Sequence, residues 1–386
     1  MKYYANIVKE AICNPKTVDF KTFVRNCLGC CIIDCVAELK KIGNIPKAKH
    51  VLEDMLNYSQ IDVERLQEVN YKPMPHMIDS DWRFTKQSAQ YLLNRVKTLL
   101  KENSRCLLVG TPSLVNLGLQ HDNIQYTLIE RNQTSLVYDN KIYCDILKYD
   151  TEIKYDCIVC DPPWYKNTYL DFGHKFSNLI VDNGYVIIVF PPIGVRESIC
   201  NEYDEIVKFY TELGLELICN ELQTISYISS PFEINSIKNN NIYKFPIDWR
   251  TGNLCIFKKN ARKTSVKYRY NKALKTDWDE FIVENIRFFI KNDTIELQHA
   301  FINKIFKNDI LPSVSMRNEK LKDVNLWTSG NRVFKCNNTA LLVKLLAAME
   351  KYGVAKSKLQ YPNSIECISF IEDIIIKEKD EYAKYW

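Results

Sequence analysis

The chain has 386 residues, a hydrophobic content of 46% and a formal net charge of +5 at pH 7. This composition supports a sizeable core, the length predicts two domains or one domain with large extensions, and the mild positive charge permits a nucleic-acid partner. The 14 cysteines follow no regular spacing, and no signal peptide or membrane-spanning run is visible, so we expect a cytoplasmic protein with neither a disulfide framework nor a membrane partner.

Residues 1–75 are predicted to form an N-terminal helical region. Apolar residues recur at helical spacing over 20–43 and 45–58, and 62–69 adds another turn or two. Four cysteines, Cys27, Cys30, Cys31 and Cys35, lie in this region. A zinc site needs a second pair of ligands, which does not follow at the usual distance, whereas three of the cysteines share one face of the expected helix. Core packing is therefore favoured over metal binding.

A linker is expected at residues 71–81, which contain Pro73 and Pro75. The aromatic and basic cluster 82–84 follows, and Thr85 or Ser88 is a suitable N-cap for the next helix. The cluster is either a lid or a docking segment.

From residue 105 onwards, short apolar runs alternate with helical patterns. Strands are expected at 106–109, 126–129, 141–144, 156–160, 185–190, 215–222 and 253–258, with a clear helix at 201–214. Such alternation predicts a largely parallel sheet that is covered by helices. In an open sheet of this kind, ligands bind at the carboxyl ends of the strands.

The stretch after the fourth strand contains the candidate catalytic residues Asp161, Pro162, Pro163 and Trp164. The two prolines fix a rigid, extended turn directly after the strand. Asp161 can accept one N–H of an exocyclic amine and the Pro162 carbonyl can accept the other, while Trp164 can stack on a flat ring. The next three residues, Tyr165, Lys166 and Asn167, are expected to line the substrate pocket.

Three other strand ends match the pattern of a known fold. The first strand ends in Gly110-Thr111-Pro112, the second in Glu130, 20 residues after Gly110, and the third in Asp145. Together with Asp161, this spacing resembles the class I S-adenosylmethionine-dependent methyltransferase fold over roughly residues 80–260. The resemblance implies S-adenosyl-L-methionine as cofactor. Its methionine part would lie on the loop 110–112, its ribose hydroxyls on Glu130 and its adenine amino group on Asp145, with Asp161 also close to it.

The sequence Asp-Pro-Pro-Trp at 161–164 resembles the signature of amino-methyltransferases that modify N6 of adenine. The resemblance implies methylation of DNA or RNA. The usual Gly-x-Gly-x-Gly pattern is absent, because the first loop has only Gly110 with Pro112 nearby. Two other interpretations stay open: a methyltransferase for glutamine or lysine side chains of proteins, and a degenerate methyltransferase fold that binds nucleic acid or protein. A tryptophan at 164, rather than tyrosine or phenylalanine, favours a nucleobase.

Residues 261–386 are predicted to form a mainly helical C-terminal domain with a possible role in substrate recognition. Helices are expected at 277–291, 295–307, 339–352 and 365–377, and a tight connection, rather than a substrate contact, is favoured at 327–332. The join at 258–275 contains eight Lys or Arg and no acid. Its Lys267 and Arg269 alternate with tyrosines, which suits nucleic-acid binding as well as it suits a solvated linker.

The predicted fold class is therefore α/β, with a Rossmann-like class I methyltransferase core of seven mostly parallel strands at residues 76–260 and helical extensions on both sides. The five histidines are scattered, so we expect no metal site.

Overall fold

The computed structural model of the chain describes residues 2–57, 72–117, 119, 123–134, 136–261, 266–270, 277–291, 301–306, 308–314 and 318–384. The chain forms two compact units. The first unit comprises Met1–Ile61, Arg83–Ser229 and Lys244–Lys272, and the second comprises Asp62–Trp82, Ser230–Tyr243 and Ala273–Trp386. These units cut across the expected linear division at residues 75 and 260, because the N-terminal helices belong to the first unit and a segment from the middle of the chain belongs to the second.

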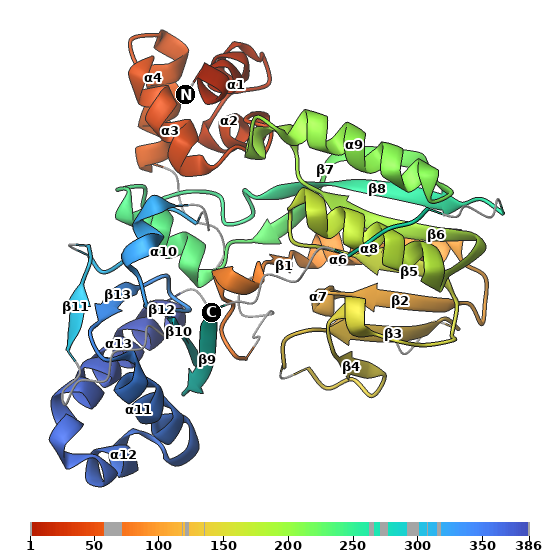
Figure 1. The fold of residues 1–386 in the computed structure, drawn as a ribbon. Helices are drawn as coiled ribbons and strands as arrows, with labels where there is room; N and C mark the ends of the chain where they lie inside the picture. Colours follow the sequence, from red (N-terminus) through yellow and green to blue (C-terminus); the bar gives the residue numbers. More distant parts are fainter. Residues whose placement is uncertain are drawn as a thin grey trace. The chain divides into compact units, whose positions relative to one another are not determined.

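The first unit contains an eight-stranded sheet in the order β1-β7-β8-β6-β5-β2-β3-β4 (Figure 1). The strands are β1 (Arg83–Phe84), β2 (Arg105–Val109), β3 (Gln125–Glu130), β4 (Lys141–Tyr143), β5 (Tyr155–Cys160), β6 (Ile180–Phe190), β7 (Leu215–Ile228) and β8 (Thr251–Lys259). Pairing is parallel from β4 through β6, and β8 lies antiparallel between β6 and β7. The predicted mostly parallel Rossmann-like α/β sheet is thus confirmed, with β1 as an additional short strand.

Helices cover both faces of this sheet. They are α6 (Lys86–Leu99), α7 (Pro112–Val115), α8 (Lys166–Leu179) and α9 (Ile199–Glu212), with short 3-10 turns η3 (Ile146–Lys148) and η4 (Ile193–Val195). Figure 1 shows α8 and α9 on one face and α6 on the other. The strands between them are continuous apolar runs that are buried, as in residues 106–109, 157–160 and 186–190, which is typical of parallel strands covered on both sides. Thr85 caps α6 by accepting a hydrogen bond from the Ser88 amide at 3.2 Å, so the first of the two predicted caps is confirmed.

Two strands are longer than predicted because each contains a bulge. β6 begins at Ile180 rather than at the predicted residue 185, and it continues through Asn183, which adopts a φ of +64°. β7 continues beyond residue 222 through Gln223, which has a φ of +54°, and its register with β8 shifts between Glu221 and Ile225. A bulge bends a strand and re-aims the side chains that follow it.

The N-terminal region forms α1 (Lys2–Cys13), α2 (Phe20–Asn26), α3 (Ile32–Lys41) and α4 (Pro46–Asn57). The single helix predicted at 20–43 is wrong, because Leu28 and Gly29 adopt left-handed φ values of +54° and +79° and end it. Cys27 and Cys31 are cap residues of two separate helices, so the shared helix face does not exist. Burial of the cysteines is nevertheless observed, since Cys27, Cys30 and Cys35 are fully buried. The predicted turn at 62–69 lies outside the described residues.

The loop between α2 and α3 packs on the turn that follows β6. The Gly194 amide donates to the Leu28 carbonyl at 2.8 Å. A Cβ atom at position 194 would lie 2.4 Å from that carbonyl oxygen and 2.6 Å from the Cys27 carbonyl oxygen. The Tyr4 hydroxyl adds a hydrogen bond to the Val195 carbonyl at 3.3 Å. These contacts place the N-terminal helices at the carboxyl end of β6, within the first unit.

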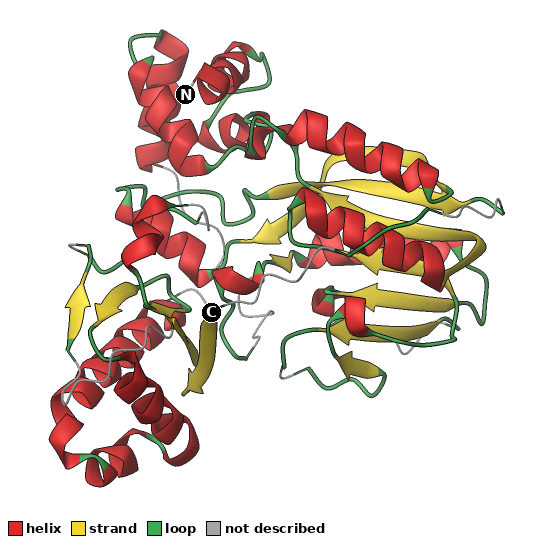
Figure 2. Cartoon of the chain, in the orientation of Figure 1, coloured by secondary structure: helices red, strands yellow, loops and turns green. Residues whose placement is uncertain are grey.

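The second unit is built on a five-stranded antiparallel sheet in the order β11-β13-β12-β10-β9. Its strands are β9 (Trp278–Val283), β10 (Ile286–Lys291), β11 (Ile302–Lys304), β12 (Leu326–Thr328) and β13 (Val333–Cys336). Its helices are α10 (Pro231–Asn239), α11 (Thr339–Tyr352), α12 (Val354–Gln360) and α13 (Ile365–Ala383), with 3-10 turns η1 (Met77–Asp79), η5 (Glu319–Asp323) and η6 (Pro362–Ser364). Figure 2 shows helices gathered beside this smaller sheet, and apolar residues of α11 and α13 form one core with it.

The predicted helix at 277–291 is wrong. This segment is the hairpin β9–β10, whose turn residues Glu284 and Asn285 have φ values of +52° and +73°. Two consecutive positive φ values are typical of a tight hairpin turn, whose twist matches the flanking strands. The helix predicted at 295–307 is wrong as well, because the described part of this segment contains β11. The helix predicted at 339–352 is confirmed as α11. The helix predicted at 365–377 is confirmed as α13, which extends six residues further. Trp327 and Thr328 belong to β12, and residues 329–332 join it to β13. All of these residues are buried, which agrees with a tight connection.

None of the helices in the described ranges combines the length and the apolar character needed to cross a bilayer.

We predict that Gly194→Ala destabilises the first unit. The new methyl group would overlap two backbone oxygens that cannot move independently, and overpacking of this kind costs about 1–3 kcal/mol. Gly43→Ala is the matched control, because its Cβ would be 3.3 Å from the nearest atom and no positive φ is involved. Urea denaturation of both variants checks the prediction. Equal stability of the two variants would show that the close contact at Gly194 is not required.

Candidate active site

The carboxyl ends of the parallel strands bring the predicted site residues to one edge of the first sheet. β2 and β5 are neighbours, with Val109 paired with Cys160. The residues that follow them are therefore adjacent: the Asp161 amide donates to the Val109 carbonyl at 3.3 Å, and a Cβ on Gly110 would lie 3.4 Å from the Asp161 carbonyl oxygen. The expected cofactor loop and the expected catalytic motif thus lie side by side.

The Asp161 carboxyl is partly buried and receives its hydrogen bonds from aromatic side chains. The Tyr227 hydroxyl donates to its Oδ1 at 2.8 Å. Burial raises the pKa of Asp161 to about 7, even though hydrogen bonds from Tyr227 and Trp164 and the positive charge of Arg83 act to lower it. Near neutral pH this carboxyl therefore exists in both protonation states, which is typical of a group that handles protons.

Aromatic rings surround this carboxyl. The Trp164 ring meets the Tyr227 ring edge to face, with centroids 5.7 Å apart. The guanidinium of Arg250 lies 5.9 Å from the Trp164 centroid and 4.8 Å from that of Trp249. The Pro163 carbonyl accepts from the Tyr165 amide at 2.7 Å and closes the turn, and Pro162 is buried. The site therefore combines a carboxylate, an indole and a guanidinium.

The residues expected to bind the cofactor share features of a ligand cradle. Gly110 adopts a φ of +62°, which favours glycine. Thr111 is only 1% exposed, and within the described residues its hydroxyl has no hydrogen-bond partner. Pro112 begins the short helix α7. The buried, unsatisfied hydroxyl beside a left-handed glycine indicates a place where a polar ligand completes the loop.

Two carboxylates end neighbouring strands at the same edge. Glu130 is 6% exposed, and its Oε1 accepts from the Asn132 amide at 3.1 Å. Asp145 follows β4, and its Oδ1 accepts from the Leu147 amide at 3.0 Å. One backbone amide therefore orients each carboxylate, as expected for residues that bind hydroxyl or amino groups of a ligand.

The residues that follow the motif begin α8. Tyr165 is 37% exposed. The Lys166 ammonium is paired with Glu205 of α9 at 2.6 Å, so its charge is already engaged. Asn167 is exposed. Tyr165 and Asn167 are thus the two exposed residues of this segment.

Lys267 and Arg269 are exposed, in a segment that packs on α8. The two tyrosines between and after them anchor the segment: the Tyr268 hydroxyl donates to Asp171 at 2.7 Å, and the Tyr270 hydroxyl lies 3.0 Å from His174 Nδ1. Residues 266–270 of the basic join are thus docked on a helix, whereas its first two residues end β8. His174 is eight residues into α8, or roughly 12 Å along its axis from Lys166.

Three residues of the site were not predicted from the sequence: Tyr227, Trp249 and Arg250. Tyr227 lies at the carboxyl end of β7, which runs parallel to β5, so it reaches the same edge. Arg250 precedes β8, which runs the opposite way and therefore begins where β6 ends. A longer predicted sixth strand would have included Tyr227, but the bulge at Gln223 interrupts the pattern.

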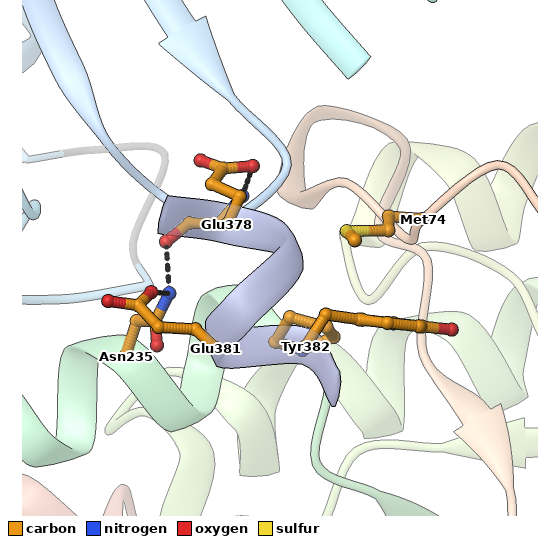
Figure 3. Close-up of a pocket in the computed structure, with 7 residues that line it drawn as sticks. Met74, Asn235, Glu378, Glu381 and Tyr382 are labelled. Carbon is orange, nitrogen blue, oxygen red and sulfur yellow. Dashed lines mark hydrogen bonds between the residues drawn. The ribbon is translucent and has the colours of Figure 1, made fainter. Parts of the chain in front are cut away.

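A small cavity lies elsewhere, in the second unit, and is lined by Met74, Pro231, Asn235, Gly330, Glu378, Glu381 and Tyr382 (Figure 3). Asn235 donates to the Gly330 carbonyl at 2.8 Å and to Glu381 at 3.1 Å. Glu378 accepts from the Gly330 amide at 3.1 Å, and burial raises its pKa to about 7. The cavity contains no predicted site residue, and its polar groups satisfy one another. In the parts of the chain that the structure describes, no group of three or more potential metal ligands is assembled.

No protein-family model matches the chain, and no curated protein matches it. Among solved structures, it is similar to a variant of the branched-chain polyamine synthase from Thermus thermophilus, with 10% identity over 71% of this chain and 92% of that chain and a TM-score of 0.49. It is also similar to the N-methyltransferase NodS from Bradyrhizobium japonicum in complex with S-adenosyl-L-homocysteine. The identity is 14% over 52% of this chain and 97% of that chain, and the TM-score is 0.30. A methyltransferase from Pyrococcus furiosus shows 16% identity over 45% of this chain and 83% of that chain, with a TM-score of 0.29. The fold assignment rests on the strand order described above.

We predict that Asp161→Asn changes how stability depends on pH. Because the pKa of Asp161 is raised to about 7, the folded protein holds this proton more tightly than the unfolded chain between about pH 4 and pH 7. Stability from this group is present below about pH 4 and is lost as the pH rises to 7, at a rate of at most about 1.4 kcal/mol per pH unit.

The neutral asparagine has no such loss, so the variant should gain stability relative to the wild type as the pH rises. Urea denaturation from pH 4.5 to 8.5 measures this, with the exposed Asp204→Asn as control. Parallel curves for Asp161→Asn and the wild type would contradict the buried, titrating carboxyl.

Proposed function

We propose that the protein is an S-adenosyl-L-methionine-dependent methyltransferase that acts on the exocyclic N6 amine of adenine in DNA or RNA. The observation that carries the proposal is the adjacency of two features: the Asp161–Trp164 motif at the end of β5, and the Gly110–Pro112 loop at the end of β2. The first suits a flat amine and the second suits a cofactor.

The residues present fit the cofactor. Gly110 and the unsatisfied Thr111 hydroxyl would hold its amino-acid part, Glu130 its ribose hydroxyls and Asp145 its adenine amino group. When bound, S-adenosylmethionine supplies an electrophilic methyl group on a positively charged sulfur. The loop has one glycine, Gly110, where methyltransferases usually have a glycine-rich loop. Cofactor binding is therefore measured directly in the test.

The motif would orient the amine. The Asp161 carboxylate accepts one N–H and the Pro162 carbonyl the other, which directs the nitrogen lone pair away from both acceptors. Proximity and orientation would supply most of the rate. With a pKa of about 7, Asp161 can also accept the proton that the amine releases.

Trp164 and Arg250 support a nucleobase as the substrate. An indole ring next to the carboxylate can stack on a base, and a guanidinium beside that ring can attract a phosphate or extend the stack. In a duplex the base must flip out, at a cost of a few kcal/mol, and a single strand avoids much of this cost.

The proposal is tested by methyl transfer. We would incubate the protein, Asp161→Ala and the surface control Asp204→Ala with labelled S-adenosylmethionine and, separately, with DNA, RNA, protein and polyamines. Products would be identified by mass spectrometry after digestion, and cofactor binding would be measured by calorimetry. We expect N6-methyladenine in one nucleic-acid pool, a rate at least about 100-fold lower for Asp161→Ala, and no change for Asp204→Ala.

The other outcomes identify the alternatives. Label in protein would indicate a side-chain methyltransferase, and label in the polyamine pool a small-amine transferase. An absence of both label and binding heat would favour a non-catalytic module with a methyltransferase-like fold.

We also propose that Lys267 and Arg269 contact the phosphate backbone. Both side chains are exposed beside tyrosines docked on α8. Replacing both by alanine should weaken binding to all sequences alike, and should reduce the slope of log K against log salt by about 2, one for each lost phosphate contact. The exposed pair Lys9 and Lys16, replaced in the same way, is the control. An unchanged slope would assign the segment to a solvated connection.

A further inference from the structure

We propose that Tyr227 is a positioning residue for Asp161: its hydroxyl holds one carboxylate oxygen in place, so that the remaining acceptor positions face the amine. This inference deepens the proposed function and rests on the role given there to Asp161. It concerns a residue of β7 that lies 66 positions from the motif in sequence.

The contact between the two side chains is short and shielded. The Tyr227 hydroxyl is 2.8 Å from Asp161 Oδ1, and the tyrosine is 1% exposed. Its ring is fixed on two sides, tilted against Phe84 at 5.2 Å and edge-on to Trp164 at 5.7 Å. A ring packed in this way has one orientation, so the hydroxyl gives the carboxyl one orientation as well.

The backbone is arranged to bring this hydroxyl to the site. The bulge at Gln223 re-aims the end of β7. Beyond it, the Tyr227 amide donates to the Arg250 carbonyl at 2.9 Å, and Phe84 of β1 pairs with Tyr227 on the opposite edge. The strand end is thus held from both sides, although β1 is only two residues long.

Gly252 of β8, which pairs with Ile225, lies close to the Tyr227 hydroxyl. A Cβ on Gly252 would be 3.4 Å from the Tyr227 hydroxyl oxygen and 2.5 Å from Val189 Cγ1. A larger residue would collide with the Val189 side chain of β6, so the glycine allows β6 and β8 to pack closely beside the site.

The chemistry defines the direction of the hydrogen bond. Burial and the nearby Asp161 charge raise the pKa of Tyr227 well above its usual range, so the phenol stays protonated and donates. A donor to a carboxylate favours the charged form. Tyr227 therefore opposes the effect of burial on Asp161 and keeps part of it ionised at neutral pH.

The test compares Tyr227→Phe with Tyr210→Phe. The phenylalanine at 227 keeps the ring packing but removes the donor. Tyr210 is equally buried and its hydroxyl donates to the Tyr169 carbonyl at 2.9 Å, so Tyr210→Phe removes one buried donor elsewhere in the same unit. We expect the acidic limb of the methyl-transfer pH profile to move up by about 1 pH unit or more in Tyr227→Phe and to stay in place in Tyr210→Phe.

The rate would therefore fall about tenfold at pH 6 and less at pH 9, with the KM for S-adenosylmethionine unchanged. If the acidic limb of the pH profile lies at the same pH in both variants, the proposal is wrong.

A second readout does not depend on activity. The pH dependence of unfolding would be measured for Tyr227→Phe, Asp161→Asn and the double variant. If Tyr227 acts on Asp161, the loss of stability with rising pH extends to higher pH in Tyr227→Phe, and this difference disappears in the Asp161→Asn background. If methyl transfer fails for every acceptor but this coupling is present, the proposed function is wrong, and only the effect of the Tyr227 hydrogen bond on Asp161 is supported. If transfer occurs without the coupling, the positioning role is wrong.

A second variant covers the case in which Tyr227→Phe does not fold. Site-specific 3-fluorotyrosine at position 227 keeps the ring and the hydroxyl but makes the phenol a stronger donor. The acidic limb should then move to lower pH, opposite to the shift in Tyr227→Phe. A limb that does not move would contradict the hydrogen bond as the source of the effect.

Discussion

The partly buried carboxyl of Asp161 is the constraint on which the rest of the site depends. A carboxylate at the end of a buried strand is disfavoured by desolvation, and burial raises its pKa to about 7. Tyr227, Trp164 and Arg83 limit that effect from three different parts of the chain. The elements that bear these residues must therefore meet at one point, which accounts for the bulge in β7 and for the pairing of the short strand β1 with it.

Segments that are remote in sequence pack at this edge and on the helices that cover the sheet. The loop between α2 and α3 packs on Gly194, just after β6, so the N-terminal helices stabilise the turn that follows one of the site's neighbouring strands. Residues 266–270 dock on α8 through Tyr268 and Tyr270. The first unit is therefore a sheet with additions at its functional edge and on its outer helices, rather than a core flanked by independent domains.

The strands near the site could be predicted because their apolar runs are buried on both sides and leave a continuous signal in the sequence. The acids that end β3 and β5 could be predicted for the same reason, since their place follows from the strand that precedes them. Tyr227 could not, because a left-handed Gln223 resets the register of β7 and the residue type gives no sign of it. The hairpin β9–β10 was predicted as a helix because Phe281, Ile282 and Ile286 also fit a helical period. The segment is instead reversed at Glu284 and Asn285, which both have positive φ values. Asparagine tolerates this conformation, whereas glutamate rarely adopts it.

The most direct test of the account is the structure of the protein crystallised with S-adenosyl-L-homocysteine and adenosine. The account predicts the cofactor on the loop after β2, with its ribose at Glu130, and the adenosine amino group within hydrogen-bond distance of both the Asp161 carboxylate and the Pro162 carbonyl. A cofactor bound elsewhere, or an adenine ring that does not approach Asp161, would contradict the assignment of this sheet edge as an amine-methylating site.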